Sequence, residues 1–181
     1  MEIPNGYNGA DIIGDIYRAR KAIYVAERGV GNADFRIVND GSRIDEMWIN
    51  IKNEKLSEYK KAQEYFESLY KKVISSKNHM SKEDYNLLLK KLGIVLGMTE
   101  NINHVEDSLY DERDLQQALD ETSDMINQKR EELNNAKQQG DEDLIIILSS
   151  EIEYYENDMK KHHWGESRLE ILNSDTSKKI K

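Results

Sequence analysis

The stretch that decides the fold is residues 114–163, DLQQALDETSDMINQKREELNNAKQQGDEDLIIILSSEIEYYENDMKKHH. Its first half carries a stripe at alternating steps of four and three: Leu115, Leu119, Thr122, Ile126, Lys129, Leu133 and Ala136. Its second half carries a similar stripe: Ile145, Leu148, Ile152, Tyr155, Met159 and His162. Between the stripes, residues 138–141 place a glycine, which ends helices, before an acid, which begins them. The pattern predicts an antiparallel helical hairpin of the coiled-coil type.

Composition points to the same fold class outside this stretch. Charged residues make up 34% of the chain, apolar residues 38%, and the mean hydropathy is −0.82. Long helices that each bury one stripe leave a wide solvated surface, which fits these values. The single proline is Pro4, so no proline interrupts a helix after that position. We therefore expect a mainly α protein, a helical bundle that carries the hairpin.

Three further helices are indicated before the hairpin. The first covers residues 10–28, with one face formed by Ile12, Ile16, Ala19, Ile23 and Ala26. The second covers about residues 42–76, with one face formed by Ile44, Trp48, Ile51, Tyr59, Ala62, Phe66, Leu69 and Val73, which Lys55 interrupts. The third begins at Ser81 and contains Gly93 and Gly97, four residues apart. That spacing lets another helix approach closely, or marks a bend.

Residues 29–42 break the helical pattern. Gly29, Gly31 and Asn32 are expected to stop the first helix. Phe35–Val38 then alternates like a short strand, and the Asn-Asp-Gly that follows is typical of a turn. We predict a short β-strand or β-hairpin near 35–43. Its partner would be residues 168–172 or a neighbouring subunit.

The expected organisation has three regions. Residues 1–100 form an N-terminal helical bundle with the short strand or loop at 29–42. Residues 101–165 form the antiparallel hairpin, and residues 166–181 form a C-terminal tail. Together they are expected to make one continuous domain.

Charge and cysteine usage limit the classes of partner and compartment. The net charge is −9 and the sequence pI is about 5.0, so we expect no non-specific binding to nucleic acid. The chain contains no cysteine, which excludes disulfides and thiolate metal sites. No apolar run approaches the roughly 20 residues that a membrane helix needs. Residues 1–6 have neither the basic start nor the apolar core of a signal peptide. We expect cytoplasmic synthesis, with incorporation into a virion or leaderless export as alternatives.

The sequence offers little catalytic chemistry. His104 follows Glu100 by four residues and His162 follows Asp158 by four, so each pair would share a helix face. Surface histidines near acids are much commoner than metal sites with this spacing, and we expect no metal and no cofactor. No serine-nucleophile motif is present, and most carboxylates fall on solvated helix faces. We predict a protein that is not an enzyme and has no catalytic residues.

The functional hypothesis is a structural or assembly protein that acts through helical interfaces in a homo-oligomer, such as a viral (phage) particle or connector component. Two alternatives are a small acidic inhibitor that imitates nucleic acid, and a secretion-system substrate or chaperone. The partners would be a second copy of the chain and other proteins. The candidate interface residues are Phe35, Ile37, Trp48, Leu115, Leu119, Ile126, Leu133, Ile145, Leu148, Ile152, Tyr155 and Trp164.

Overall fold

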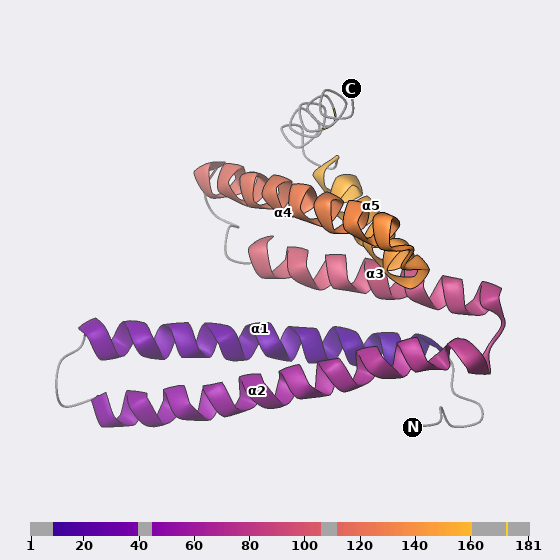
Figure 1. Ribbon diagram of the computed structural model, residues 1–181. Coiled ribbons are helices and arrows are strands. Elements are labelled where there is room, and N and C mark those ends of the chain that lie inside the picture. Colours follow the sequence, from indigo (N-terminus) through magenta and orange to yellow (C-terminus); the bar gives the residue numbers. More distant parts are fainter. Residues whose placement is uncertain (1–8, 40–44, 106–111, 161–172, 174–181) are drawn as a thin grey trace. The chain divides into compact units, whose positions relative to one another are not determined.

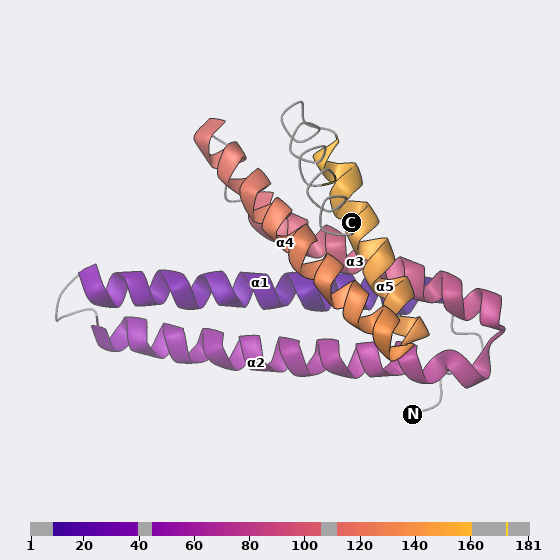
Figure 2. The same cartoon turned by 45° about the horizontal axis from the view of Figure 1, so that its top comes forward.

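The computed structural model describes residues 9–39, 45–105, 112–160 and 173, and side chains within 12–37, 46–100, 120–160 and 173. The described elements follow one another along the chain (Figures 1 and 2): α1 (Gly9–Asn39), α2 (Asp45–Ser75), the short 3-10 helix η1 (Ser76–His79), α3 (Lys82–Val105), α4 (Glu112–Gln139) and α5 (Glu142–Met159). The described part contains no strand. The predicted fold class, a mainly α helical bundle, is confirmed.

The helices divide between two compact units. Unit 1 is residues 1–81 and contains α1, α2 and η1, whereas unit 2 is residues 82–181 and contains α3, α4 and α5. The boundary predicted after residue 100 places α3 with the N-terminal helices. Within unit 2, α3 packs mainly on α5 and to a smaller extent on α4. The two units bury their apolar side chains in different ways.

In unit 1 two helices of 31 residues pack against each other along one heptad seam. The seam positions of α1 alternate by four and three residues: Ile12, Ile16, Ala19, Ile23, Ala26, Val30, Ala33 and Ile37. Those of α2 follow the same steps: Trp48, Lys52, Lys55, Tyr59, Ala62, Phe66, Leu69 and Val73. Every one of these side chains is buried or half-buried. This spacing keeps one face of each helix turned toward the other.

Contacts along the seam show that α1 and α2 run antiparallel. The Lys52 ammonium lies 2.6 Å from an Asp34 carboxylate oxygen near one end of the seam. Toward the other end, the Arg20 guanidinium lies 5.3 Å from the centre of the Phe66 ring. Small and large residues therefore come level across the seam, and Ala19 lies level with Phe66. Pairs of a small and a large residue let two helices pack closely along a seam.

The predicted strand at 35–43 is wrong over its described part, because Phe35–Val38 continues α1, which ends at Asn39. Residues 40–43 and the proposed partner strand at 168–172 lie outside the described residues. Phe35–Val38 alternates like a strand, but Ile37 and the preceding Ala33 are heptad positions of α1 that face α2. Glycine costs a helix about 1 kcal/mol relative to alanine. Burial of Val30 and Ala33 offsets that cost at Gly29 and Gly31.

Gly29 also makes room for a side chain of α2. A Cβ atom at this position would lie 2.8 Å from Cδ of Lys55, closer than real Cβ atoms come to other carbons. The Lys55 stem crosses the seam at that point, and its ammonium forms an ion pair with Glu58 at 3.1 Å. The glycine that suggests a helix end in the sequence is thus part of the seam.

In unit 2 the predicted turn between the hairpin helices is confirmed. Gly140 adopts a left-handed φ of 71°, and α4 ends one residue before it. The Asp141 carboxylate then accepts a hydrogen bond from the Leu144 N–H at 3.2 Å, which caps α5. Beyond the turn, Ile126 of α4 packs in one core cluster with Ile152, Tyr155 and Met159 of α5. Because α5 packs on α3 as well as on α4, a regular coiled coil stays a prediction.

The glycine pair of α3 lets α5 approach closely, as its spacing predicts. A Cβ atom at Gly93 would collide with the carbonyl oxygen of Ile147 and would lie 2.8 Å from Cβ of Ser150. One turn later, a Cβ atom at Gly97 would lie 3.0 Å from the Tyr154 ring. The backbones of α3 and α5 therefore touch where these two residues have no side chain.

Candidate functional site

The exposed apolar side chains are unevenly divided between the units. Among the described residues, eight large apolar side chains are exposed. Six lie on α1 and α2: Val25, Phe35, Met47, Ile49, Leu56 and Tyr65. Within unit 1, two helices that share one seam bury one face each, and no third long helix among the described residues of the unit packs on their other faces. Exposed apolar groups that lie together on one surface mark interaction sites. Ile49 and Leu56, two turns apart on α2, share one face of that helix.

One row of exposed residues on α2 repeats the spacing of a helix interface. We call it the outer stripe of α2, and its members are Glu46, Ile49, Asn53, Leu56, Lys60, Gln63 and Glu67. The steps alternate by three and four, so the stripe runs along the helix about 100° around from the seam. Ile49 is 45% exposed and Leu56 is 42% exposed. Glu46, Asn53 and Lys60 make no ion pair or side-chain hydrogen bond with another described residue.

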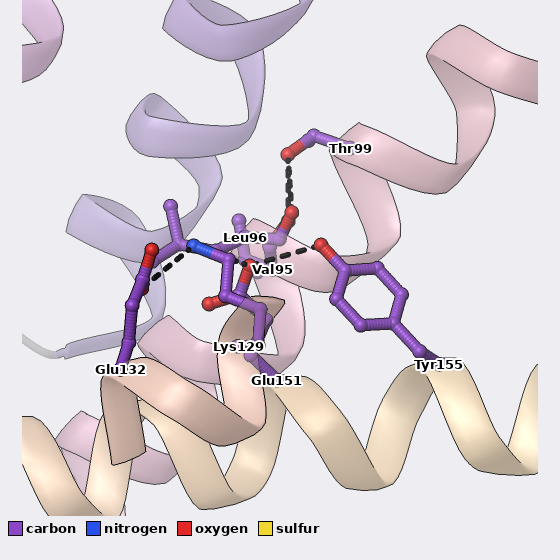
Figure 3. A network of polar contacts seen from close by, with 7 residues as sticks. All are labelled: Val95, Leu96, Thr99, Lys129, Glu132, Glu151 and Tyr155. Carbon is purple, nitrogen blue, oxygen red and sulfur yellow. Dashed lines mark hydrogen bonds and ion pairs between the residues drawn. The ribbon is translucent and has the colours of Figure 1, made fainter. Parts of the chain in front are cut away.

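Unit 2 contains a buried polar cluster that joins α4 to α5 (Figure 3). The Glu151 side chain is 5% exposed, and one of its oxygens accepts a hydrogen bond from the Tyr155 hydroxyl at 2.9 Å. The Lys129 ammonium of α4 lies 3.6 Å from the same oxygen and 3.4 Å from a Glu132 oxygen. Arg130, also on α4, forms a second ion pair with Glu156 at 2.7 Å. These contacts fix the register of α4 on α5.

The polar groups of α3 beside this cluster are satisfied within their own helix. The Thr99 hydroxyl, which is buried, donates to the Val95 carbonyl at 2.8 Å and lies 3.2 Å from the Leu96 carbonyl (Figure 3). The Tyr85 hydroxyl, in the first turns of α3, instead reaches α5 and donates to Asp143 at 2.9 Å. Buried polar groups with partners of this kind specify a fold rather than expose reactive atoms. The cluster therefore has a structural role in the packing of α4 on α5.

The two units differ sharply in charge. Unit 1 contains 12 acidic and 13 basic residues, whereas unit 2 contains 23 acidic and 13 basic residues. The net charge of −9 thus comes entirely from unit 2. In unit 2 some acids occupy the first turns of helices, Glu83 and Asp84 in α3 and Glu142 and Asp143 in α5. Negative charge at these positions interacts favourably with the helix dipole.

The residues predicted to form an interface occupy several environments. Ile126, Leu148, Ile152 and Tyr155 are buried, and Leu133 and Ile145 are half-buried, all within unit 2. In unit 1, Phe35 is 63% exposed, whereas Ile37 and Trp48 are half-buried on the seam. The Trp48 ring lies under the Arg36 guanidinium, 5.8 Å from its centre. Leu115, Leu119 and Trp164 lie outside the described side chains.

Sequence reasoning missed the outer stripe of α2. Ile49 and Leu56 are seven residues apart, and Glu46, Asn53 and Lys60 complete the heptad steps around them. That signal is present in the sequence, but the stronger apolar pattern of the seam on the same helix conceals it.

Within the described residues, no three histidine, aspartate or glutamate side chains lie close enough together to hold a metal ion. None of the described helices combines the length and apolar character that crossing a membrane requires. No family model, curated protein or solved structure matches the chain.

Proposed function

We propose that this protein is a non-enzymatic assembly protein that associates with copies of itself through the helices of unit 1. The observation that carries the proposal is the excess of exposed large apolar side chains on α1 and α2, which carry six of the eight among the described residues. A component of a viral (phage) particle or connector is one protein of this class. The proposal concerns the mode of action, which is helix-to-helix contact between subunits.

Burial and charge support unit 1 as the interface. Among the described residues of the hairpin, Ile126, Ile152 and Tyr155 are buried within unit 2 and are not accessible to a second chain. The repulsion between two copies of unit 2, with their excess of acidic residues, disfavours association through that unit. The charge of unit 1 is nearly balanced, so two copies of unit 1 associate without this electrostatic repulsion.

The mass in solution tests the proposal. Light scattering after size exclusion is measured on the full chain over a range of concentrations, at low and at high salt. We expect a mass above that of the 21.1 kDa monomer that rises with concentration and persists at high salt, because apolar contacts are not screened. A mass of one chain at every concentration would refute the proposal.

A second candidate function rests on the acidity of unit 2. An inhibitor that imitates nucleic acid presents dense negative charge to the basic groove of a nucleic-acid-binding protein, and unit 2 has ten more acidic than basic residues. Such binding weakens steeply as salt rises. A partner captured from lysate that is released between about 0.05 and 0.2 M salt favours this function. A partner that stays bound argues against it.

A further inference from the structure

The first five residues of the outer stripe of α2 are self-complementary when two copies of the helix run in opposite directions. From its N-terminal end the order is acid, apolar, amide, apolar, base: Glu46, Ile49, Asn53, Leu56 and Lys60. Asn53 lies at the centre, the two apolar residues flank it, and the opposite charges lie outermost. Reversing the direction brings apolar against apolar and acid against base. An arrangement of this kind fits a second copy of the same helix.

We propose that two copies of this chain dimerise through the outer stripe of α2, with the two helices antiparallel about a two-fold axis at Asn53. The inference rests on the proposed self-association and names its surface and symmetry. In this register Ile49 meets the partner subunit's Leu56, and Leu56 meets the partner subunit's Ile49. Glu46 likewise meets the partner subunit's Lys60. A two-fold axis repeats each contact away from the axis, so the apolar pair and the charge pair each occur twice, whereas the Asn53 pair on the axis occurs once.

Helix geometry supports this register. The pairs 49 with 56, 46 with 60, and 53 with itself are centred on the same point of the helix to within one residue. Steps of three and four keep all five side chains on one face for roughly 21 Å at 1.5 Å per residue. Asparagine at the centre of a helix interface pairs with its own copy and selects one register over others. The three contacts therefore agree on a single arrangement.

The occupant is a second copy because the charges of the stripe match only when the stripe is inverted. A parallel copy would place Glu46 beside Glu46 and Lys60 beside Lys60, which is repulsive. The contact involves only four apolar side chains in the dimer, fewer than a standard interface of about 1,600 Å² contains. We therefore expect weak, concentration-dependent association in the micromolar range.

Charge reversal tests the pairing of Glu46 with Lys60. Glu46→Lys alone places lysine against lysine twice, and Lys60→Glu alone places glutamate against glutamate twice. Each variant should raise the Kd of the dimer about tenfold or more. When the two variants are mixed, each chain offers the charge that the other needs. The mixture should form a heterodimer with nearly the Kd of the wild type.

Matched controls separate this pairing from a general charge effect. Glu54→Lys and Lys61→Glu change the same charges on exposed positions of α2 that lie on another side of the helix. We expect both to leave the Kd of the dimer within about twofold. Failure of the mixture to recover the dimer would overturn the inference. Equal weakening by the two control variants would do so as well.

A crosslink tests the two-fold axis directly, because the native chain has no cysteine. Asn53→Cys should give a disulfide-linked dimer on mild oxidation, since the two copies of residue 53 face each other. Ser68→Cys is the control, because the two copies of residue 68 would be about 45 Å apart along the helices. Crosslinking of both variants at the same rate, or of neither, would contradict the axis.

The outcomes distinguish the two proposals. A wild-type chain that remains a monomer refutes both the assembly function and the α2 dimer. A wild-type oligomer whose mass is insensitive to Glu46→Lys and Lys60→Glu refutes the α2 dimer alone. Helical content by circular dichroism should stay unchanged in all variants, because every substituted side chain is exposed.

Discussion

Unit 1 and unit 2 bury the apolar faces of their amphipathic helices in different ways. Unit 2 places α5 against both α3 and α4 and adds a buried polar cluster between α4 and α5. Unit 1 places two long helices along one seam and leaves the outer stripe of α2 in water. A helix with one neighbour buries one face, whereas a helix with two neighbours buries most of its apolar surface. In the function proposed above, a second copy of the chain covers the face that unit 1 leaves exposed.

The largest difference is expected for the same substitution at two glycines. Gly93→Ala forces a Cβ atom into the Ile147 carbonyl oxygen and should lower the free energy of unfolding by about 3 kcal/mol. Gly31→Ala, in α1, meets no atom within 4 Å and should raise the free energy of unfolding by about 0.5–1 kcal/mol. Urea denaturation measures both values. Equal effects would mean that α3 and α5 do not approach as closely as described.

The next comparison is between Lys129, which lies between α4 and α5, and Lys55, which lies on the seam of unit 1. Lys129→Met removes the ammonium beside the buried Glu151 and should cost about 2 kcal/mol. Lys55→Met keeps the stem that packs over Gly29 and loses only a solvated ion pair with Glu58. That change should be neutral or stabilising by up to about 1 kcal/mol. If Lys55→Met destabilised the protein as much as Lys129→Met, the seam of unit 1 would depend on polar contacts too.

A smaller difference is expected for two tyrosine hydroxyls. Tyr155→Phe leaves Glu151 without its hydroxyl donor and should cost about 1–2 kcal/mol. Tyr59→Phe removes a hydroxyl that bonds to Gln63 on the exposed face of α2, and its effect should stay below about 0.5 kcal/mol. Thermal unfolding of the two variants side by side decides whether the polar cluster contributes as described. Two equal shifts in Tm would argue that it does not.

Local signals in the sequence predicted local structure well. The Gly140-Asp141 pair indicates the turn because glycine accepts the left-handed φ and aspartate caps the next helix. The spacing of Gly93 and Gly97 indicates a close helix approach or a bend, and the structure shows the close approach. In these cases the physical cause lies within a few residues of the signal.

Features that depend on distant residues could not be predicted in the same way. Gly29 and Gly31 read as a helix end, because the burial of Ala33 against α2 and the crossing of Lys55 over Gly29 involve residues far along the chain. The pairing of Lys129 with Glu151 depends on the register of α4 on α5, which the sequence pattern left open. The mainly α class follows from composition and periodicity, whereas the outer stripe of α2 is masked in the sequence by the stronger apolar pattern of the seam on the same helix.

The most direct test of the central claim compares the two units in one sample. Hydrogen–deuterium exchange of the full chain is followed by mass spectrometry at about 1 µM and about 100 µM, since mass action stabilises only the surface that associates. We expect exchange to slow with concentration in peptides of α2 that contain Asn53 and to stay unchanged in peptides of α5. Exchange that is independent of concentration in α2, or that slows equally in α5, would contradict the claim that unit 1 is completed by a second copy.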